Sequence, residues 1–108
     1  VREKKVLSLE EAVRMLTSRP AEVFGIKDRG KLEKGAPADV VVFDPDTVGA
    51  SALRRVHDLP AGEDRLIADA IGVTAVVVNG TIIRENGTDM LSAGDKLPGR
   101  LLRNGMAA

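Results

Sequence analysis

The first regular apolar pattern lies near the start of the chain, where Leu9, Val13 and Leu16 recur at spacings of four and three. That spacing predicts an α-helix with one apolar stripe. Ser8 stands just before the stripe and Glu11 three positions later, a pair typical of a capping box. We therefore expect a helix that begins after Ser8, with the Glu11 side chain reaching back to the Ser8 N–H.

A second, shorter helix is expected directly afterwards. Pro20 suits the first position of a helix, where its missing N–H loses no hydrogen bond. Gly25 is a typical residue at a helix C-terminus. Because one turn of helix is not stable alone, we interpret the two helices as packing elements rather than as a self-sufficient bundle.

After residue 28 the pattern changes from helical to β. Residues 40–43 read Val-Val-Val-Phe between turn-forming neighbours, which predicts a strand buried on both faces. A short strand is also expected at residues 31–32, between two glycine-bearing turns. Residues 48–70 have no regular pattern, and for residues 64–70 a helical turn and an extended edge are both open.

The clearest β signal is a hairpin in the second half of the sequence. The apolar run 73–78 is followed by Asn79-Gly80 and then by the β-rich run 81–84. Asn-Gly favours a two-residue turn, because both turn positions need a positive φ. Residues 85–87, Glu-Asn-Gly, are expected to end the second strand. A sheet of so few apolar strands has exposed edges. We therefore expect another segment or another copy to cover these edges.

Composition and charge exclude several classes of partner. The 108 residues include 16 basic and 16 acidic side chains, so no net field attracts nucleic acid or an anionic membrane. The chain has no cysteine, which excludes disulfides and thiolate metal ligands and is consistent with a reducing compartment. No signal peptide and no run of membrane-spanning length is visible. We therefore expect a cytoplasmic location.

Candidate catalytic and metal-binding residues are few. His57 is the single histidine, and we interpret it as a loop residue rather than a general base, because a lone histidine cannot form an ordinary zinc site. Residues 44–46, Asp-Pro-Asp, lack the spacing of a calcium loop and are interpreted as a turn. Asp39 is expected to bind backbone N–H groups rather than act as a buried acid. We predict no catalytic, cofactor-binding or metal-ligating residue in this chain.

Several motifs, in their order along the sequence, resemble the C-terminal part of amidohydrolase-superfamily enzymes. The superfamily motifs are residues 7–13, 16–21, 24–32 and 35–44, the last reading Gly-Ala-Pro-Ala-Asp-Val-Val-Val-Phe-Asp. Further motifs are similar to the D-aminoacylase, or N-acyl-D-amino-acid deacylase, branch: residues 56–60, 76–80, 84–87 and 97–103. The resemblance covers residues 7–104.

The resemblance implies an α+β fold with three parts. Residues 1–27 would be the terminal helical segment of a (β/α)8 barrel, made of the last barrel helix and a short helix. Residues 28–104 would be the C-terminal part of a small composite β-domain, as a partial β-sandwich, and residues 105–108 a tail.

The resemblance also implies a role. Enzymes of this family cleave amide bonds with one or two divalent metals, usually zinc, bound by a His-x-His pair, further histidines and a final Asp. None of these motifs occurs in this chain, which is expected to start after the final Asp. We therefore expect a non-catalytic piece of a hydrolase of N-acyl D-amino acids, partnered by the rest of the parent polypeptide or by another copy in a homo-oligomer. A standalone β-rich binding module and a subunit that completes an active site in trans are the alternatives.

Overall fold

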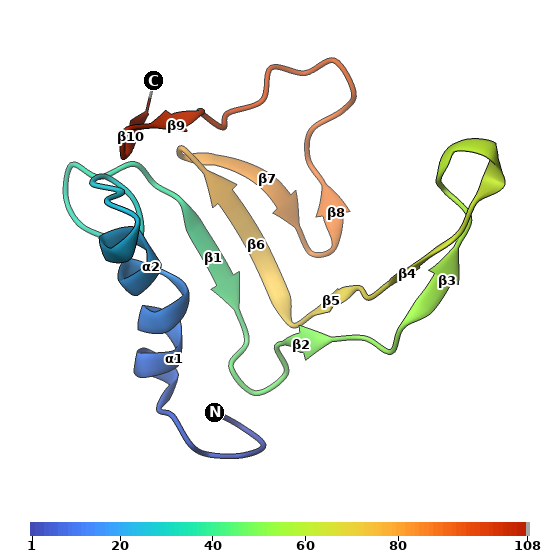
Figure 1. Ribbon diagram of the computed structural model, residues 1–108, viewed down its shortest axis with the longest axis horizontal. Coiled ribbons are helices and arrows are strands. Elements are labelled where there is room, and N and C mark those ends of the chain that lie inside the picture. The colour runs from blue at the N-terminus through green and yellow to red at the C-terminus, as the bar shows by residue number, and fades with distance from the viewer. Residues whose placement is uncertain (108) are drawn as a thin grey trace.

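The computed structural model describes residues 1–107. Its elements are two helices followed by short β-strands (Figure 1). Helix α1 spans Leu9–Leu16 and helix α2 spans Ser18–Val23, with only Thr17 between them. The strands form one four-stranded antiparallel sheet and three two-stranded ladders. The predicted α+β class is thus confirmed, whereas the assignment of the helices to a barrel and of the strands to a composite β-domain stays a prediction.

Helix α1 begins where the sequence predicts, but its cap is simpler than a full capping box. The Ser8 hydroxyl accepts a hydrogen bond from the Glu11 N–H at 3.1 Å. The prediction that the Glu11 side chain reaches back to Ser8 is wrong, because both carboxylate oxygens accept hydrogen bonds from Arg14 at 2.9 and 3.0 Å. These hydrogen bonds hold the pKa of Glu11 below its ordinary value.

Helix α2 starts earlier than predicted. It begins at Ser18, so Pro20 is its third residue rather than its first. This position still lies in the first turn, whose N–H groups need no partner within the helix. Gly25 follows the helix as predicted, with a φ of 68°, a left-handed conformation that glycine adopts without strain.

The main sheet has the strand order β1-β6-β7-β8. Its strands are β1 (Val40–Phe43), β6 (Val73–Val78), β7 (Thr81–Glu85) and β8 (Thr88–Asp89). Between β6 and β7, Asn79 and Gly80 have φ values of 47° and 78°, which confirms the predicted two-residue turn. Asn86 and Gly87 lead from β7 into β8.

Two predicted features of the first β segment are wrong. Strand β1 lies at the edge of the sheet, and Val41 and Val42, which point to opposite faces, are 54% and 47% exposed. It is therefore not buried on both faces. Residues 31–32 form no strand and belong to the loop between α2 and β1. A β-branched apolar run predicts an extended backbone. Whether other segments bury its two faces depends on residues far away in the sequence.

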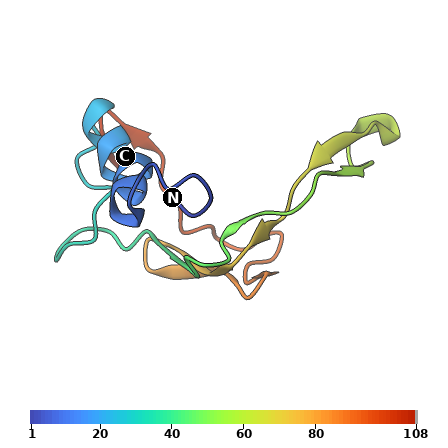
Figure 2. The ribbon, with the colours of Figure 1, turned by 90° about the horizontal axis from the view of Figure 1, so that it is seen from below.

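Residues 49–71 form a two-stranded projection, which we call the arm. Strand β2 (Gly49–Ala50) pairs with β5 (Ala70–Ile71), and β3 (Arg54–Val56) pairs with β4 (Arg65–Ile67). The 3-10 turn η1 (Pro60–Gly62) lies at its tip. Figure 2 shows the arm leaving the sheet and rising on the same side of it as the helices. Residues 65–67 are thus extended rather than helical.

A C-terminal hairpin, which the sequence analysis missed, lies beside α2. Strand β9 (Leu102–Arg103) pairs with β10 (Met106–Ala107) across a turn at Asn104 and Gly105. The Lys27 N–H donates a hydrogen bond to the Gly105 carbonyl at 2.9 Å. The predicted tail, residues 105–108, is therefore partly a strand, while Ala108 lies outside the described residues. The division at residues 27 and 28 stays a prediction.

The structure has almost no core of its own. Among the residues whose exposure is described, only Ala21 is a buried hydrophobic residue, at 7% exposure. Leu16, part of the predicted apolar stripe, is 82% exposed. The radius of gyration is 16.4 Å, against about 13 Å for a compact domain of 100 residues. The helices and strands are formed, but few side chains are buried between them.

Candidate functional site

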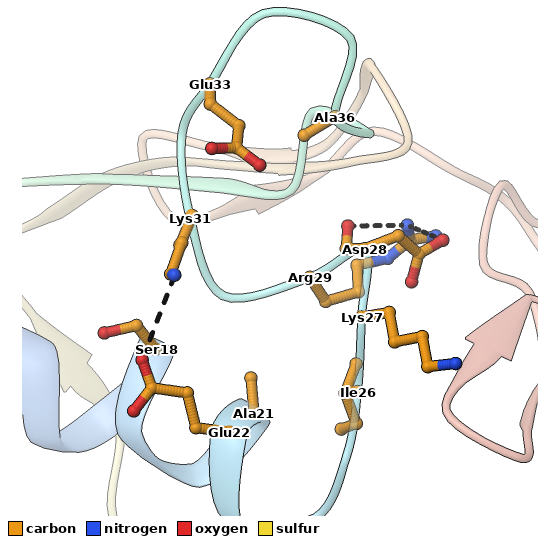
Figure 3. Close-up of a pocket in the computed structure, with 10 residues that line it drawn as sticks. All are labelled: Ser18, Ala21, Glu22, Ile26, Lys27, Asp28, Arg29, Lys31, Glu33 and Ala36. Atoms are coloured by element: carbon orange, nitrogen blue, oxygen red, sulfur yellow. Dashed lines mark hydrogen bonds and ion pairs between the residues drawn. The ribbon is translucent and has the colours of Figure 1, made fainter.

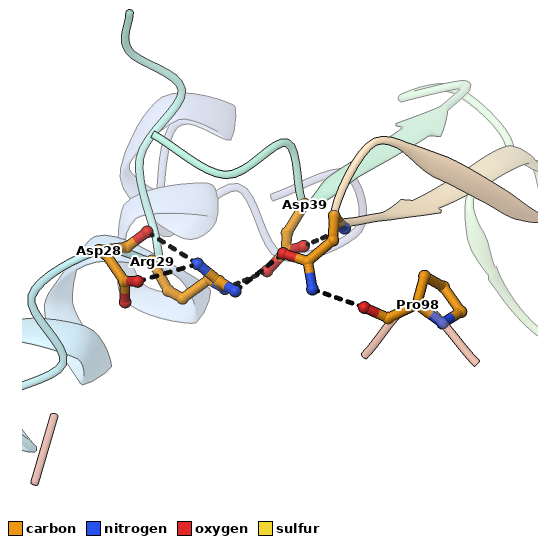
Figure 4. Close-up of polar contacts among 5 residues, drawn as sticks. Asp28, Arg29, Asp39 and Pro98 are labelled. Carbon is orange, nitrogen blue, oxygen red and sulfur yellow. Dashed lines mark hydrogen bonds and ion pairs between the residues drawn. The ribbon is translucent and has the colours of Figure 1, made fainter. Parts of the chain in front are cut away.

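The most enclosed polar cluster among the described residues has Arg29 at its centre (Figure 4). The Arg29 side chain is only 13% exposed. The Nε atom donates to Asp39 Oδ2 at 2.7 Å, and Nη1 pairs with Asp28 Oδ2 at 3.2 Å. A third contact runs from Nη2 to Asn79 Oδ1 at 2.9 Å. We call these four side chains the Arg29 cluster.

The Arg29 cluster joins segments that are far apart in sequence. Asp39, at the start of β1, accepts a hydrogen bond from the Asn79 N–H at 2.8 Å. Asn79 in turn donates from Nδ2 to the Pro98 carbonyl at 2.7 Å. Asp39 was predicted to bind nearby backbone N–H groups, but the one that it binds belongs to a turn 40 positions away, and its other oxygen pairs with Arg29. Arg29 and Asn79 are members that the sequence analysis did not single out, since no local pattern marks a contact over 50 positions.

A small polar cavity adjoins the Arg29 cluster between α2 and the following loop (Figure 3). Its volume is about 90 Å³. It is lined by Ser18, Ala21, Glu22, Ile26, Lys27, Asp28, Arg29, Lys31, Glu33 and Ala36. Binding pockets for organic ligands usually measure roughly 300 Å³ or more. This cavity is therefore too small for an N-acyl amino acid.

A second and wider hollow is an open apolar cleft of about 740 Å³ between α1 and β1. From the helical side it is lined by Val6, Leu9, Ala12, Val13 and Leu16, and from the other side by Val41, Phe43, Pro45 and Val48. Arg2 closes one end by donating to the Pro45 carbonyl at 3.0 Å and the Val48 carbonyl at 2.9 Å. Most of its lining is apolar, and the charged side chains in it, Arg2, Glu3 and Lys4, come from one short segment before α1. The cleft therefore suits packing rather than catalysis.

The other candidate residues of the sequence analysis are not brought together. His57 lies near the tip of the arm and is exposed, with Nδ1 3.3 Å from the Gly62 carbonyl. Asp44 lies at the end of β1, where its Oδ1 accepts the Asp46 N–H at 2.8 Å. The interpretation of residues 44–46 as a turn is therefore confirmed.

The residues of this chain do not fit a metal ion. Within residues 1–107, no three histidine, aspartate or glutamate side chains are grouped so that they could hold one. Several aspartates are paired with arginines instead, as Asp39 is with Arg29, and Asp44 accepts a backbone N–H. We therefore derive no metal-dependent step from these residues.

One face of the arm is bridged by two bidentate ion pairs. Arg54 donates to Asp69 at 2.9 and 3.1 Å, and Arg65 donates to Asp58 at 2.7 and 2.6 Å. The hydrogen bonds from these arginines hold the pKa of both aspartates below its ordinary value. A lowered folded-state pKa stabilises the folded arm at pH values above the unfolded pKa of about 4, and this contribution is lost as the pH falls through the folded pKa.

We accordingly expect the arm to open on acidification before the main sheet does. Amide hydrogen exchange should show protection in β3 and β4 falling below about pH 4, with β6 and β7 still protected. In the double variant Asp58→Asn/Asp69→Asn this pH dependence should be weaker, and the part that remains is due to Asp64, which pairs with Arg55 in the same arm. Simultaneous loss of protection in the arm and the sheet of the unaltered protein would contradict the prediction.

None of the helices formed by residues 1–107 combines the length and the apolar character needed to cross a bilayer.

Comparison with known proteins gives matches over most of this chain. Residues 1–84 match the amidohydrolase family. An N-acyl-D-glutamate deacylase of Alcaligenes xylosoxydans xylosoxydans is 44% identical over 103 residues, which cover 95% of this chain and 18% of that protein. An N-acyl-D-aspartate deacylase of the same organism is 36% identical over 107 residues, covering 99% of this chain and 19% of that protein.

A shorter match relates the sequence to a different group of enzymes. A dihydroorotase of Lactobacillus gasseri is 54% identical over 44 residues, covering 41% of this chain and 10% of that protein. No solved structure matches the sequence. The chain spans less than a fifth of the length of each of these three relatives. The family match covers most of its residues, so the chain belongs to the amidohydrolase family, and over nearly its whole length it is similar to N-acyl-D-amino-acid deacylases.

Proposed function

We propose that this chain is the C-terminal structural part of a metal-dependent amidohydrolase that cleaves N-acyl D-amino acids, and that it carries none of the catalytic residues. The observation that carries the proposal is the open apolar cleft between α1 and β1. A stripe of helical side chains and an edge strand face each other there without filling the space between them. Such surfaces are normally covered in a folded protein.

Strand β1 offers a free hydrogen-bonding edge at the same place. The Asp44 N–H donates to the Gly72 carbonyl at 2.8 Å, on the side of β1 that faces β6. Backbone groups of successive strand residues point alternately to the two edges, so those of Val41 and Phe43 point away from β6. The same two side chains line the cleft. An added strand would therefore pair with β1 and place its own side chains against α1.

The length of the relatives supports one source for that cover. The two deacylases align with nearly the whole of this chain, yet more than four-fifths of each lies outside the aligned part. We propose that the corresponding remainder of a longer polypeptide supplies the missing strand and the body behind α1. In this arrangement α1 is the last helix of a barrel, the main sheet belongs to a composite β-domain, and zinc is bound by residues upstream.

The substrate class proposed for the whole enzyme follows the names of the two relatives, which are deacylases of N-acyl-D-glutamate and N-acyl-D-aspartate. We propose that the complete enzyme takes N-acyl D-amino acids with an acidic side chain. The contribution of residues 1–108 to that reaction is the support of the barrel and not a contact with substrate.

The proposal is tested by grafting this chain onto the glutamate deacylase in place of its aligned segment. We expect a soluble chimera that hydrolyses N-acyl-D-glutamate, while residues 1–108 alone with added zinc hydrolyse none. Leu16→Asp, inside the cleft, should abolish the soluble chimera. The matched control Leu97→Asp alters a side chain that is 69% exposed and outside the cleft lining, and it should have little effect.

The non-catalytic role has its own readout in the same chimera. His57→Ala should leave kcat/KM unchanged, whereas loss of a general base would lower the rate by about 100-fold or more. An inactive chimera beside an active parent enzyme would overturn the structural assignment. Hydrolysis by residues 1–108 alone would overturn the statement that the catalytic residues lie elsewhere.

A further inference from the structure

Three turns of the protein have the same dipeptide, Asn-Gly, but hold it in different surroundings. They are Asn79-Gly80 between β6 and β7, Asn86-Gly87 between β7 and β8, and Asn104-Gly105 between β9 and β10. All three asparagines have a left-handed backbone, with φ values of 47°, 49° and 53°. The local sequence and the local conformation are therefore matched, and only the tertiary contacts differ.

An Asn-Gly bond can react without any cofactor or enzyme. The glycine backbone nitrogen attacks the amide carbon of the asparagine side chain, because no Cβ on the next residue blocks its approach. A new bond forms between that carbon and the glycine nitrogen, the bond from that carbon to Nδ2 breaks, and ammonia leaves with the proton lost by the glycine N–H. Water then opens the resulting succinimide at either carbonyl, which yields aspartate or isoaspartate.

We propose that Asn86 is a site of spontaneous deamidation through a succinimide with Gly87, and that the Arg29 cluster protects Asn79 from the same reaction. The side chain of Asn86 is exposed and makes no hydrogen bond within residues 1–107. A Cβ placed on Gly87 would meet no atom within 4 Å, so the turn has open space around it.

The turn at Asn86 and Gly87 is followed by a strand that forms few hydrogen bonds. Strand β8 has only two residues, Thr88 and Asp89, and it lies at the outer edge of the main sheet. It pairs with β7 alone, and the turn before it is tied to β6 by one hydrogen bond, from the Asn86 N–H to the Thr74 carbonyl at 2.8 Å. Short edge segments of this kind have a low cost of local unfolding. Opening matters because a left-handed hairpin turn must rearrange before the glycine nitrogen reaches the asparagine amide.

Asn79 lacks this freedom. Its Oδ1 accepts a hydrogen bond from Arg29 Nη2 at 2.9 Å, and its Nδ2 donates to the Pro98 carbonyl at 2.7 Å. Attack on the Asn79 amide requires both hydrogen bonds to break. Arg29, whose side chain is 13% exposed, would then lose one of its partners. The same cluster thus ties the fold together and keeps this amide from reacting.

Asn104 is expected to react at an intermediate rate. Its side chain is exposed, like that of Asn86. Its neighbour Gly105, however, is held by the Lys27 N–H at 2.9 Å and packs so closely on the Gly25 carbonyl that a Cβ would collide with it. The turn therefore has less freedom to bring the glycine nitrogen onto the asparagine amide.

Deamidation at Asn86 would alter the edge of the sheet. A new carboxylate would appear beside Glu85 and near Asp89, in a part of the sheet where Arg84 and Asp89 already form an ion pair. Isoaspartate adds a backbone atom to a two-residue turn whose geometry is set by two positive φ values. We expect the β7–β8 pairing to be lost in that product.

The test follows the three asparagines in one sample of the folded protein kept at neutral pH and body temperature. Cleavage after Arg84, Lys96 and Arg103 places each asparagine on a separate peptide for mass spectrometry. Asn86 should convert at least about tenfold faster than Asn79, which corresponds to roughly 1.4 kcal/mol less cost of opening. In urea, where all three turns are unfolded, the three rates should become similar.

Two variants separate the causes. In urea, Gly87→Ala should slow conversion at Asn86 alone, because a Cβ then blocks the attacking nitrogen. The comparison is made in urea because Gly87 has a φ of 80° in the folded turn, where an alanine would strain the turn. Arg29→Lys keeps a positive charge near Asp39 but loses the bond to Asn79, and it should speed conversion at Asn79. Equal rates at Asn79 and Asn86 in the folded protein would overturn the proposal. So would an unmodified Asn86 in a folded sample whose unfolded control reacts.

Discussion

Replacing Arg29 by alanine is expected to lower the free energy of unfolding by about 2–4 kcal/mol. This value lies between the cost of losing one hydrogen bond to a charged group and the cost of removing one partner of a buried ion pair. Arg29 bridges Asp28, Asp39 and Asn79 while being only 13% exposed. Its loss leaves two carboxylates without their cation and frees the turn between β6 and β7.

Arg54→Ala is the matched control for Arg29→Ala. It removes a bidentate arginine–aspartate pair of similar length, but the two side chains are 55% and 57% exposed. Exposed pairs of this kind add little to stability, because solvent screens the two charges. Urea unfolding followed by far-UV circular dichroism measures both, since the sequence has no Trp or Tyr to serve as a fluorescent probe. Equal destabilisation by the two variants would show that burial of the Arg29 cluster has no energetic importance.

The substitution Gly72→Ala is expected to destabilise the fold by about 3 kcal/mol, from backbone strain together with overpacking. Gly72 joins the arm to β6 with a φ of 71°. An added Cβ would lie 2.6 Å from both Thr47 Oγ1 and the Val48 backbone nitrogen. The backbone of residues 47 and 48 would have to move, and with it the start of the arm.

Gly62→Ala separates the two causes, because Gly62 has the same φ of 71° but no atom within 4 Å of the added Cβ. It should cost only the left-handed strain of an alanine, about 1–2 kcal/mol. The difference between the two variants in urea unfolding therefore measures the close approach of Gly72 to Thr47. If both variants had the same midpoint, the close packing at Gly72 would not exist in solution.

Local features of the fold were predictable because they depend on neighbours in sequence. Ser8 caps α1, Gly25 follows α2, and Asn79-Gly80 forms the turn of the main hairpin. Each reflects a conformational preference or a hydrogen bond that spans only a few residues. The same logic applied to Asn104-Gly105 would have predicted the C-terminal hairpin, but the short flanking strands carried too little apolar pattern to draw attention to it.

Features that depend on what lies against a segment were not predictable. Residues 40–43 form a strand, yet their position at the sheet edge leaves Val41 and Val42 half exposed. The side chain of Glu11 pairs with Arg14 rather than closing the capping box, because two donors compete for one carboxylate. Residues 49–71 form a pair of strands with solvent on both faces, so polar and apolar residues do not alternate regularly along them. Such a sequence pattern does not distinguish a strand from a loop.

The two helices, the main hairpin and the resemblance to amidohydrolases, which the family match then confirmed, were all predictable from the residues. That Arg29, Asp39 and Asn79 meet, and that the apolar stripe of α1 faces an open cleft, became visible only in the folded molecule. The two groups of features differ in the sequence distance over which their interactions act. Caps and turns are fixed by bonds within a few residues, whereas the Arg29 cluster and the cleft depend on contacts between segments that lie far apart in sequence.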